Sequence, residues 1–204
     1  MPRTRGGSRR RVLSALRRSA PVPVPLPEVT AGEPTGGVDQ LRHWLEVAGA
    51  QLERLPDERA LGPWLADYPP FASARRIVST LPGIPGAEHA TAAVGDPHAC
   101  ADVDLAIARG EFAVAENGAI WLSDAEVPHR SLYFLAQHLV LVVEASEIVG
   151  DLHAAYARIE RAPEPIGARP WRGFIAGPSK TADIEQALVV GAHGPRSLLV
   201  ALVG

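Results

Sequence analysis

Apolar residues recur along this chain at spacings that predict helices. The first such group predicts an amphipathic helix over about residues 38–48, and it consists of Val38, Leu41, Trp44, Leu45 and Ala48. A weaker helical pattern covers about 57–68, and another helix is predicted over about 148–159. A further short helix is expected over 181–188, directly after a glycine-containing turn.

Short apolar runs between these segments predict strands. The runs are rich in β-branched and aliphatic residues and are bounded by turn-forming residues, and they cover 50–55, 76–81, 138–144, 174–176 and 197–203. Asn117-Gly118 lies between two further strand-like segments, 112–116 and 119–123. Because both residues tolerate positive φ, this pair predicts a two-residue hairpin turn.

Strands that alternate with helices predict an α/β fold. We expect three layers, with a largely parallel sheet, helices on both of its faces and one antiparallel hairpin. A chain of 204 residues with 47% hydrophobic residues is long enough to bury one sizeable core. We therefore predict one α/β domain over residues 36–204, preceded by an arm over residues 1–35.

The predicted arm is strongly basic. Its first 18 residues hold seven arginines and no acidic residue, whereas the other 13 of the 20 basic residues share the rest of the chain with all 23 acidic residues. Such an arm can bind nucleic acid, acidic lipid or an acidic partner, or its charges can simply face water. No aromatic residue interleaves the arginines as base stacking requires, so we do not expect nucleic acid as a partner. Alternating prolines then predict an extended polyproline II strap over Pro21–Pro27.

Apolar runs in this chain are short. Leu139–Val143 falls far below the roughly 18–20 residues that cross a bilayer. Val12–Leu16 is also shorter than the apolar region of about 7–15 residues in a secretory signal. We therefore expect a soluble, cytoplasmic protein without a membrane partner.

Cys100 is the single cysteine of the chain. It can form no internal disulfide, and it cannot supply the four thiolates of an iron–sulfur cluster, so such a cluster has to sit on a partner protein. Asp96, His98 and Cys100 alternate as potential metal ligands, but this spacing on a proline-containing loop matches no zinc site. We expect neither a metal nor a cofactor in this chain.

The strongest candidate for chemistry is Gly177-Pro178-Ser179-Lys180-Thr181-Ala182-Asp183, between a predicted strand and a predicted helix. Free N–H groups at a helix start favour an anion. Gly177 would let the backbone approach that ligand, Lys180 would add charge, and Ser179 and Thr181 would offer hydroxyls, so the segment predicts a carboxylate or phosphate cradle. The structural alternative is that Ser179 and Thr181 only cap the helix.

Other titratable residues lie near this segment or near the hairpin. Glu116 could act as a general base or anchor a ligand hydroxyl, or it could brace the turn through backbone N–H groups. His193 lies in a loop that could fold back over the glycine-rich turn and shuttle protons near pH 7. Asp183 fits a ligand role or a favourable position in the first helical turn. His138 opens an apolar strand and is interpreted as a core residue.

Several segments resemble one known family. Gly177–Glu185 and the following Val190-Gly191-Ala192-His193-Gly194-Pro195 resemble the terminal signature of the LUD-domain family, in its lactate utilization protein C group. Ala113–Gly118 resembles that family's Ile-Ala-Glu-Thr-Gly-Thr segment, and Arg130–His138 resembles its approach to a strand. The arginine-rich helix around Val12–Leu16 resembles the family's amino-terminal helix.

This resemblance implies a fold related to the sugar-phosphate isomerase and CoA-transferase superfamily. It also implies a role in oxidising L-lactate to pyruvate beside two iron–sulfur partner proteins, and ligand contacts at Asn117, Gly118, Arg130 and Gly194. Two departures put such contacts in question. Asn117 and Ala119 replace hydroxyl residues of the family, and Phe134-Leu135-Ala136 replaces a Leu-Pro-Pro step.

Two functions remain open at this point. In the first, the chain is a non-redox accessory subunit of L-lactate utilization that binds a small carboxylate or docks to an iron–sulfur partner. In the alternative, it is a stand-alone enzyme acting on a phosphorylated or CoA-like substrate, with Glu116 as base and Gly177–Thr181 as the anion cradle.

Overall fold

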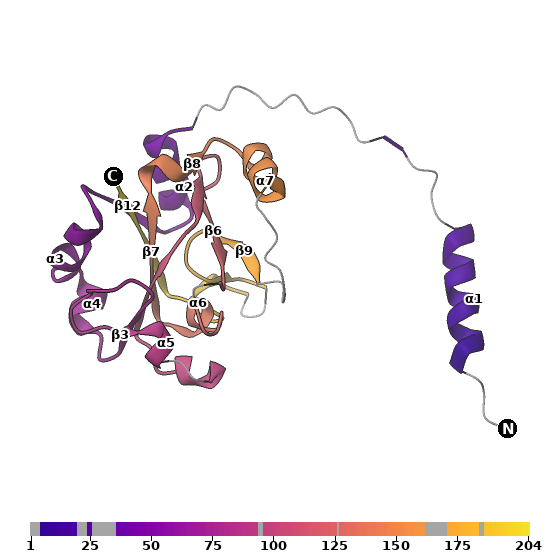
Figure 1. Cartoon of the computed structure of the whole chain (residues 1–204), viewed down its shortest axis with the longest axis horizontal. Coiled ribbons are helices and arrows are strands. Elements are labelled where there is room, and N and C mark those ends of the chain that lie inside the picture. Colours follow the sequence, from indigo (N-terminus) through magenta and orange to yellow (C-terminus); the bar gives the residue numbers. More distant parts are fainter. Residues whose placement is uncertain are drawn as a thin grey trace. The chain divides into compact units, whose positions relative to one another are not determined.

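The computed structural model describes residues 5–19, 24–25, 36–93, 96–125, 127–161, 171–183 and 186–204. The chain divides into two compact units, Met1–Ala31 and Gly32–Gly204. The first contains helix α1 (Arg5–Arg18), which confirms the expected arginine-rich helix (Figure 1). The predicted strap Pro21–Pro27 lies outside the described residues except for Val24 and Pro25.

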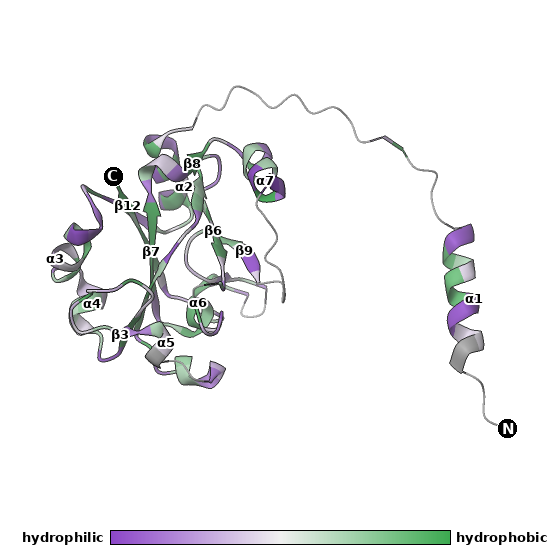
Figure 2. Cartoon of the chain, in the orientation of Figure 1, coloured by the Kyte–Doolittle hydropathy of each residue, from purple (hydrophilic) through white to green (hydrophobic). Residues whose placement is uncertain are grey.

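A six-stranded sheet, parallel throughout, forms the centre of the second unit. Its strand order is β1-β12-β7-β4-β2-β3. The strands are β1 (Gln51–Leu55), β12 (Ser197–Val203), β7 (His138–Glu144), β4 (Leu105–Arg109), β2 (Ile77–Ser79) and β3 (Glu88–His89). Strands β7 and β12 are hydrophobic along most of their length (Figure 2). They are buried on both faces, which explains why their sequences are continuous apolar runs.

A second, four-stranded sheet contains the predicted hairpin. Its order is β8 (Ile148–Val149), β5 (Phe112–Val114), β6 (Ala119–Ser123) and β9 (Arg172–Ile175). Strands β5 and β6 are antiparallel, which confirms the hairpin. Helix α7 (Leu152–Arg161) packs its Ala155 among aromatic and aliphatic side chains of this sheet. It begins later than predicted because Ile148 and Val149 pair with β5.

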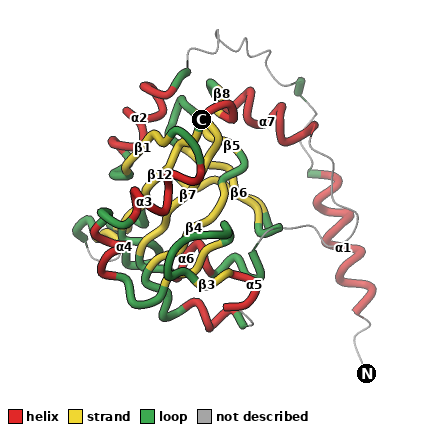
Figure 3. The backbone as a smooth tube through the Cα atoms, turned by 60° about the vertical axis from the view of Figure 1, so that its left-hand side comes forward, coloured by secondary structure: helices red, strands yellow, loops and turns green. Residues whose placement is uncertain are grey.

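Helices cover both faces of the six-stranded sheet, as predicted. On one face lie helix α3 (Leu61–Leu65), which follows the turn η1 (Glu58–Ala60), and helix α4 (Pro69–Ser73). The other face packs against α2 (Val38–Val47), α6 (Leu132–Leu135) and the four-stranded sheet. Strands occupy the middle of the unit and helices its outside (Figure 3). Short helical segments complete it, namely α5 (Ala90–Ala93), η2 (Pro97–Cys100) and η3 (Ala145–Glu147).

The hairpin turn differs from the predicted two-residue turn. Val114 pairs with Ala119, so the loop has four residues. Gly118 alone of this loop has positive φ, at 71°, and its N–H donates to the Val114 carbonyl over 3.0 Å. The Asn117 side chain accepts from the Ala119 N–H over 3.0 Å. This local hydrogen bond of Asn117 stabilises the four-residue loop that stands in place of the expected two-residue turn.

The prediction of a helix over residues 181–188 is wrong for those of them that the structure describes. Lys180–Thr181 forms strand β10, which pairs antiparallel with β11 (Val189–Val190). Thr181, Val189 and Val190 are β-branched and suit an extended strand. Gln186, inside the predicted helix, has a φ of 54°, which a right-handed helix does not allow.

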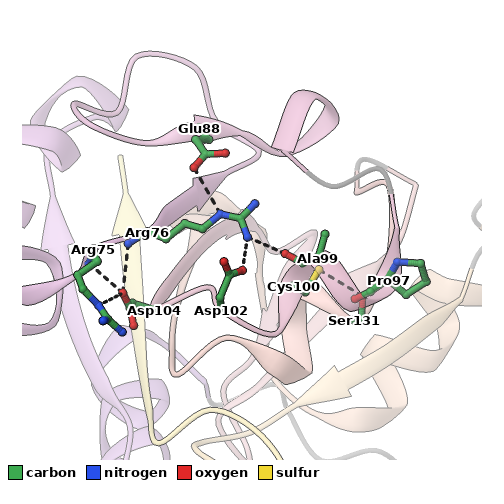
Figure 4. A network of polar contacts seen from close by, with 9 residues as sticks. All are labelled: Arg75, Arg76, Glu88, Pro97, Ala99, Cys100, Asp102, Asp104 and Ser131. Atoms are coloured by element: carbon green, nitrogen blue, oxygen red, sulfur yellow. Dashed lines mark hydrogen bonds and ion pairs between the residues drawn. The ribbon is translucent and has the colours of Figure 1, made fainter.

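Polar contacts tie together the starts of strands β2, β3 and β4 (Figure 4). The Arg76 guanidinium bonds to the Ala99 carbonyl over 2.7 Å and pairs with Glu88 and Asp102. The Asp104 carboxylate accepts from the backbone N–H groups of Arg75 and Arg76, and these bonds lower the pKa of Asp104 below its ordinary value. We interpret these contacts as structural, since they hold the starts of the three strands together.

We predict that Gly118→Ala destabilises the fold more than Gly83→Ala. Both glycines have similar positive φ, 71° and 76°, so both variants carry the left-handed penalty of about 1–2 kcal/mol. A Cβ at Gly83 meets nothing within 4 Å, whereas one at Gly118 lies 3.0 Å from the Leu45 nitrogen. The added crowding costs roughly 1–3 kcal/mol, measurable by urea unfolding. Equal losses in the two variants would contradict the contact between hairpin and helix.

Candidate functional site

The glycine-rich segment braces the end of helix α2. Gly177 has a φ of 82°, and a Cβ there would lie 2.5 Å from the Ala48 carbonyl oxygen. The Lys180 ammonium donates a hydrogen bond to that same carbonyl. A cation and a donor at the last carbonyls of a helix are stabilising. The described residues after Lys180 start no helix, so the expected helix-start cradle has no structural basis.

Neighbouring predicted residues pack against one another in the same region. The Ser179 N–H donates to the Pro195 carbonyl, and the Ser179 carbonyl accepts from the Gly191 N–H, both over 2.9 Å. A Cβ at Gly194 would lie 3.1 Å from the Ser179 Cβ, so Ser179 and Gly194 are brought together as expected. Pro178 is buried, whereas Asp183 and His193 are exposed.

Glu116 contacts helix α7 instead of the glycine-rich segment. Its carboxylate accepts from the Leu152 N–H over 2.9 Å, and Asp151 accepts from the Ala154 N–H over 2.7 Å. Both carboxylates thus satisfy free donors of the first turn of α7. The geometry favours the bracing interpretation of Glu116, although the braced element is α7 and not the hairpin turn.

Arg130 is exposed and lines a cavity of about 530 Å³ beside α6. The nearby Cys100 is fully buried, and its sulfur accepts from the Ser131 hydroxyl over 3.3 Å. The Asp96 carboxylate accepts from the backbone N–H of His98 over 2.8 Å, which lowers the pKa of Asp96. Among the described residues, no group of three or more His, Cys, Asp or Glu side chains could hold a metal ion.

A cleft of about 720 Å³ lies at the amino edge of the six-stranded sheet. Helix α2 and strand β1 contribute Arg42, Glu46 and Glu53, while the α3–α4 segment contributes Trp64, Asp67 and Tyr68. His138 and Ser197 line it from the first positions of β7 and β12. In the part of the chain that the structure describes, its lining includes none of the predicted site residues. Lys180 nevertheless lies next to it, since a Cβ on the lining residue Gly49 would be 3.5 Å from the Lys180 ammonium.

Three polar side chains are hydrogen-bonded within this cleft. Ser197 and His138 are register partners on adjacent parallel strands, and Ser197 Oγ lies 2.7 Å from His138 Nδ1. The Ser197 side chain is also hydrogen-bonded to Tyr68. Tyr68 is 8% exposed. Burial raises the pKa of Tyr68 above 10.0 despite the opposing effect of this bond. We call Tyr68, Ser197 and His138 the cleft triad.

The environment of His138 favours its neutral form. Burial lowers the pKa of His138 below 6.5, the nearby Arg196 charge lowers it further, and Asp104 acts in the opposite direction. At neutral pH the imidazole is therefore mostly uncharged and can donate or accept a hydrogen bond. A histidine with a perturbed pKa beside a hydroxyl in a concave cleft is a physically grounded candidate site.

The sequence alone does not identify the cleft triad, because its three residues lie far apart in the chain. The apolar pattern predicts a core position for His138 and does not distinguish Ser197 or Tyr68. One signal was present, however: a polar residue opens each of the longest apolar strands, at His138 and Ser197. If those strands are adjacent and parallel in register, the two side chains have to lie side by side.

Comparison with known proteins identifies related sequences. The model of the LUD domain family matches residues 94–203, which is more than half of the chain. The "Lactate utilization protein C" of Bacillus pumilus is 38% identical over 86 residues, or 42% of this chain and 36% of that protein. The protein of the same name from Geobacillus thermodenitrificans is 36% identical over 98 residues, or 48% of this chain and 41% of that protein. The match thus spans about two fifths of the length of these curated relatives.

A solved structure shares the fold. A DUF162 family protein from Deinococcus radiodurans matches with a TM-score of 0.55 and 20% identity, covering 82% of this chain and 96% of that chain. At this identity the likeness concerns the fold alone. Within the cleft triad, His138 and Ser197 lie inside the region matched by the family model, and Tyr68 lies outside it.

We predict a pH-dependent stability that depends on His138. Because its pKa is lowered in the fold, the unfolded chain binds more protons between that lowered pKa and about 6.5. The stability is therefore complete above about pH 6.5, falls as the pH drops through this window, and levels off below it. The slope is at most about 1.4 kcal/mol per pH unit. Urea unfolding from pH 5 to 8 should show a smaller slope in His138→Gln, and identical slopes would contradict the assignment.

Proposed function

This chain belongs to the LUD domain family, and we propose that it serves lactate utilization as a non-redox component that binds a small monocarboxylate in the amino-edge cleft. The observation that carries the proposal is the hydrogen-bonded cleft triad, Tyr68, Ser197 and His138. The names of the relatives support the pathway, and the cleft supports the mode of action.

The cleft triad suits a ligand with a hydroxyl or keto group beside a carboxylate. A hydroxyl, a phenol and a neutral imidazole can each donate or accept, so they can reorganise around either a hydroxy acid or an oxo acid. Arg42 lines the same cleft and supplies a guanidinium, one nitrogen of which donates to the Leu52 carbonyl over 2.7 Å. The remaining donors of a guanidinium match a carboxylate.

The charges of the cleft favour a monocarboxylate over a phosphorylated or CoA-like ligand. Its lining carries Arg42 together with three carboxylates, those of Glu46, Glu53 and Asp67. These carboxylates repel a phosphate with two charges about twice as strongly as a monocarboxylate, whose single charge the one guanidinium can pair. Glu46 and Asp67 are exposed, so solvent screens their repulsion of a small anion.

In this proposal, electron transfer takes place on separate iron–sulfur proteins. A cluster needs several thiolates, and this chain supplies only Cys100, which is fully buried against Ser131. The chain would hold the organic acid while a partner accepts electrons. An enzyme using Glu116 as base has less support, since that carboxylate bonds to the first turn of α7.

Binding of L-lactate or pyruvate, measured by calorimetry, tests this proposal. We expect Ser197→Ala and His138→Leu to lose roughly 1.5–3 kcal/mol of binding free energy, because each removes a hydrogen bond to a charged ligand. That loss corresponds to about a tenfold to hundredfold weaker affinity. Ser123→Ala, at the end of β6 in the other sheet, is the matched control and should bind as the unmodified chain does. Unchanged affinity in both cleft variants, or no binding of either acid, would overturn the proposal.

A further inference from the structure

A second cavity, of about 250 Å³, lies at the carboxyl edge of the six-stranded sheet. Thr80 directly follows the end of β2 and Arg109 ends β4, and both residues line this cavity. The rest of its lining consists of Gly110, Glu111, Ser123, Ala125 and Tyr133. Among the described residues, none lines both this cavity and the amino-edge cleft. The two sites are therefore separate.

The connections of β2 and β4 explain the position of this cavity. The two strands are neighbours in the sheet. From β2 the chain continues to β3 on one side, whereas from β4 it continues through the second sheet to β7 on the other side. Diverging connections leave a crevice outside the carboxyl ends of the two strands, and open α/β sheets usually bind ligands at this point.

The cavity is lined by hydroxyl groups, one of which has no partner. Thr80 Oγ1 is buried and, in the part of the chain that the structure describes, makes no hydrogen bond. A buried hydroxyl without a partner is costly and calls for an explanation such as a bound molecule. Rotation of Thr80 about χ1 would turn this hydroxyl into the cavity. The Tyr133 hydroxyl donates to the Ser123 carbonyl over 2.9 Å, which fixes the backbone that carries the Ser123 hydroxyl.

Negative charge is in excess around the cavity. The Arg109 guanidinium bonds to Glu58 and lies 3.8 Å from the Glu144 carboxylate, so two carboxylates surround this one cation. Glu111 adds a third carboxylate, in the lining itself. The cavity therefore repels an anion and attracts a cation. Because Glu111 is exposed, added salt should weaken this attraction.

We infer that this cavity binds a small organic molecule through a protonated primary amine. An ammonium group has three N–H donors and no acceptor. Three oxygen acceptors are available to it, in the Glu111 carboxylate and in the hydroxyls of Thr80 and Ser123. The volume lies below the roughly 300–1,000 Å³ of pockets for drug-sized ligands, so the body of the molecule is short.

Other ligand classes fit these groups less well. An alcohol matches the hydroxyls but gains nothing from the excess of negative charge, and a quaternary ammonium ion has the charge but no N–H donor. A metal ion has no support either, since the described residues include no group of three or more His, Cys, Asp or Glu side chains able to hold one. This inference stands apart from the proposed lactate cleft, and either can fail without the other.

An NMR titration of the full chain with propylammonium chloride at neutral pH tests the inference. We expect the amide signals of Thr80, Gly110 and Glu111 to shift, with a Kd on the order of 1 mM for so small a probe. Two matched probes, 1-propanol and tetramethylammonium chloride, lack either the charge or the N–H donors. Each should bind at least about tenfold more weakly.

Two variants assign the contacts. Glu111→Gln should weaken propylammonium binding by about tenfold, because it removes a charged acceptor. The control Glu160→Gln makes the same change at an exposed position on α7 and should bind as the unmodified chain does. Thr80→Val keeps the side-chain shape and removes an unpartnered hydroxyl, so it should weaken binding severalfold without lowering the stability of the free chain.

Several results would overturn the inference. These are the absence of shifts at the cavity, shifts confined to the amino-edge cleft, and equal binding of propylammonium and either matched probe. Equal affinities of Glu111→Gln and Glu160→Gln would also overturn it. A Thr80→Val variant that is less stable but binds unchanged would do the same, because the hydroxyl would then have only a structural role.

Discussion

The close approach of two turns to the end of helix α2 organises the second unit. Gly118 and Gly177, nearly 60 residues apart, both have positive φ, and a Cβ on either would crowd this helix end, at Leu45 within α2 or at Ala48 directly after it. Lys180 adds a hydrogen bond to the same helix end. Since α2 also carries Arg42 and Glu46, these contacts hold one wall of the cleft in place. Residues distant from any ligand can in this way be required for its site.

Parallel pairing in register places the polar groups of the cleft. His138 and Ser197 begin β7 and β12, so the pairing of these strands brings an imidazole and a hydroxyl together at the amino edge. Ligands of open α/β sheets more often bind at the carboxyl ends of the strands. At that edge of this sheet, Arg109 is paired with Glu58 and Glu144, so its charge is already compensated.

The elements predicted most accurately from the sequence are those that are buried along nearly their whole length. Strands β7 and β12 have the predicted bounds because both faces of each are buried, and no competing pattern interrupts their apolar runs. The segment after Gly177 was mispredicted because its pairing partner, Val189–Val190, lies across a turn that local periodicity does not reveal. The cleft triad depends on contacts between Tyr68, His138 and Ser197, and no local pattern encodes contacts between such distant positions. The family resemblance located the glycine-rich segment but not its contact with α2.

The position of a bound organic acid tests the central claim most directly. A crystal structure of the chain with L-lactate or pyruvate should show the ligand in the amino-edge cleft, within hydrogen-bonding distance of Ser197 or His138. Density for the acid beside Gly177 and Ser179, with the cleft empty, would contradict this account. Such density would indicate that the glycine-rich segment is the ligand site.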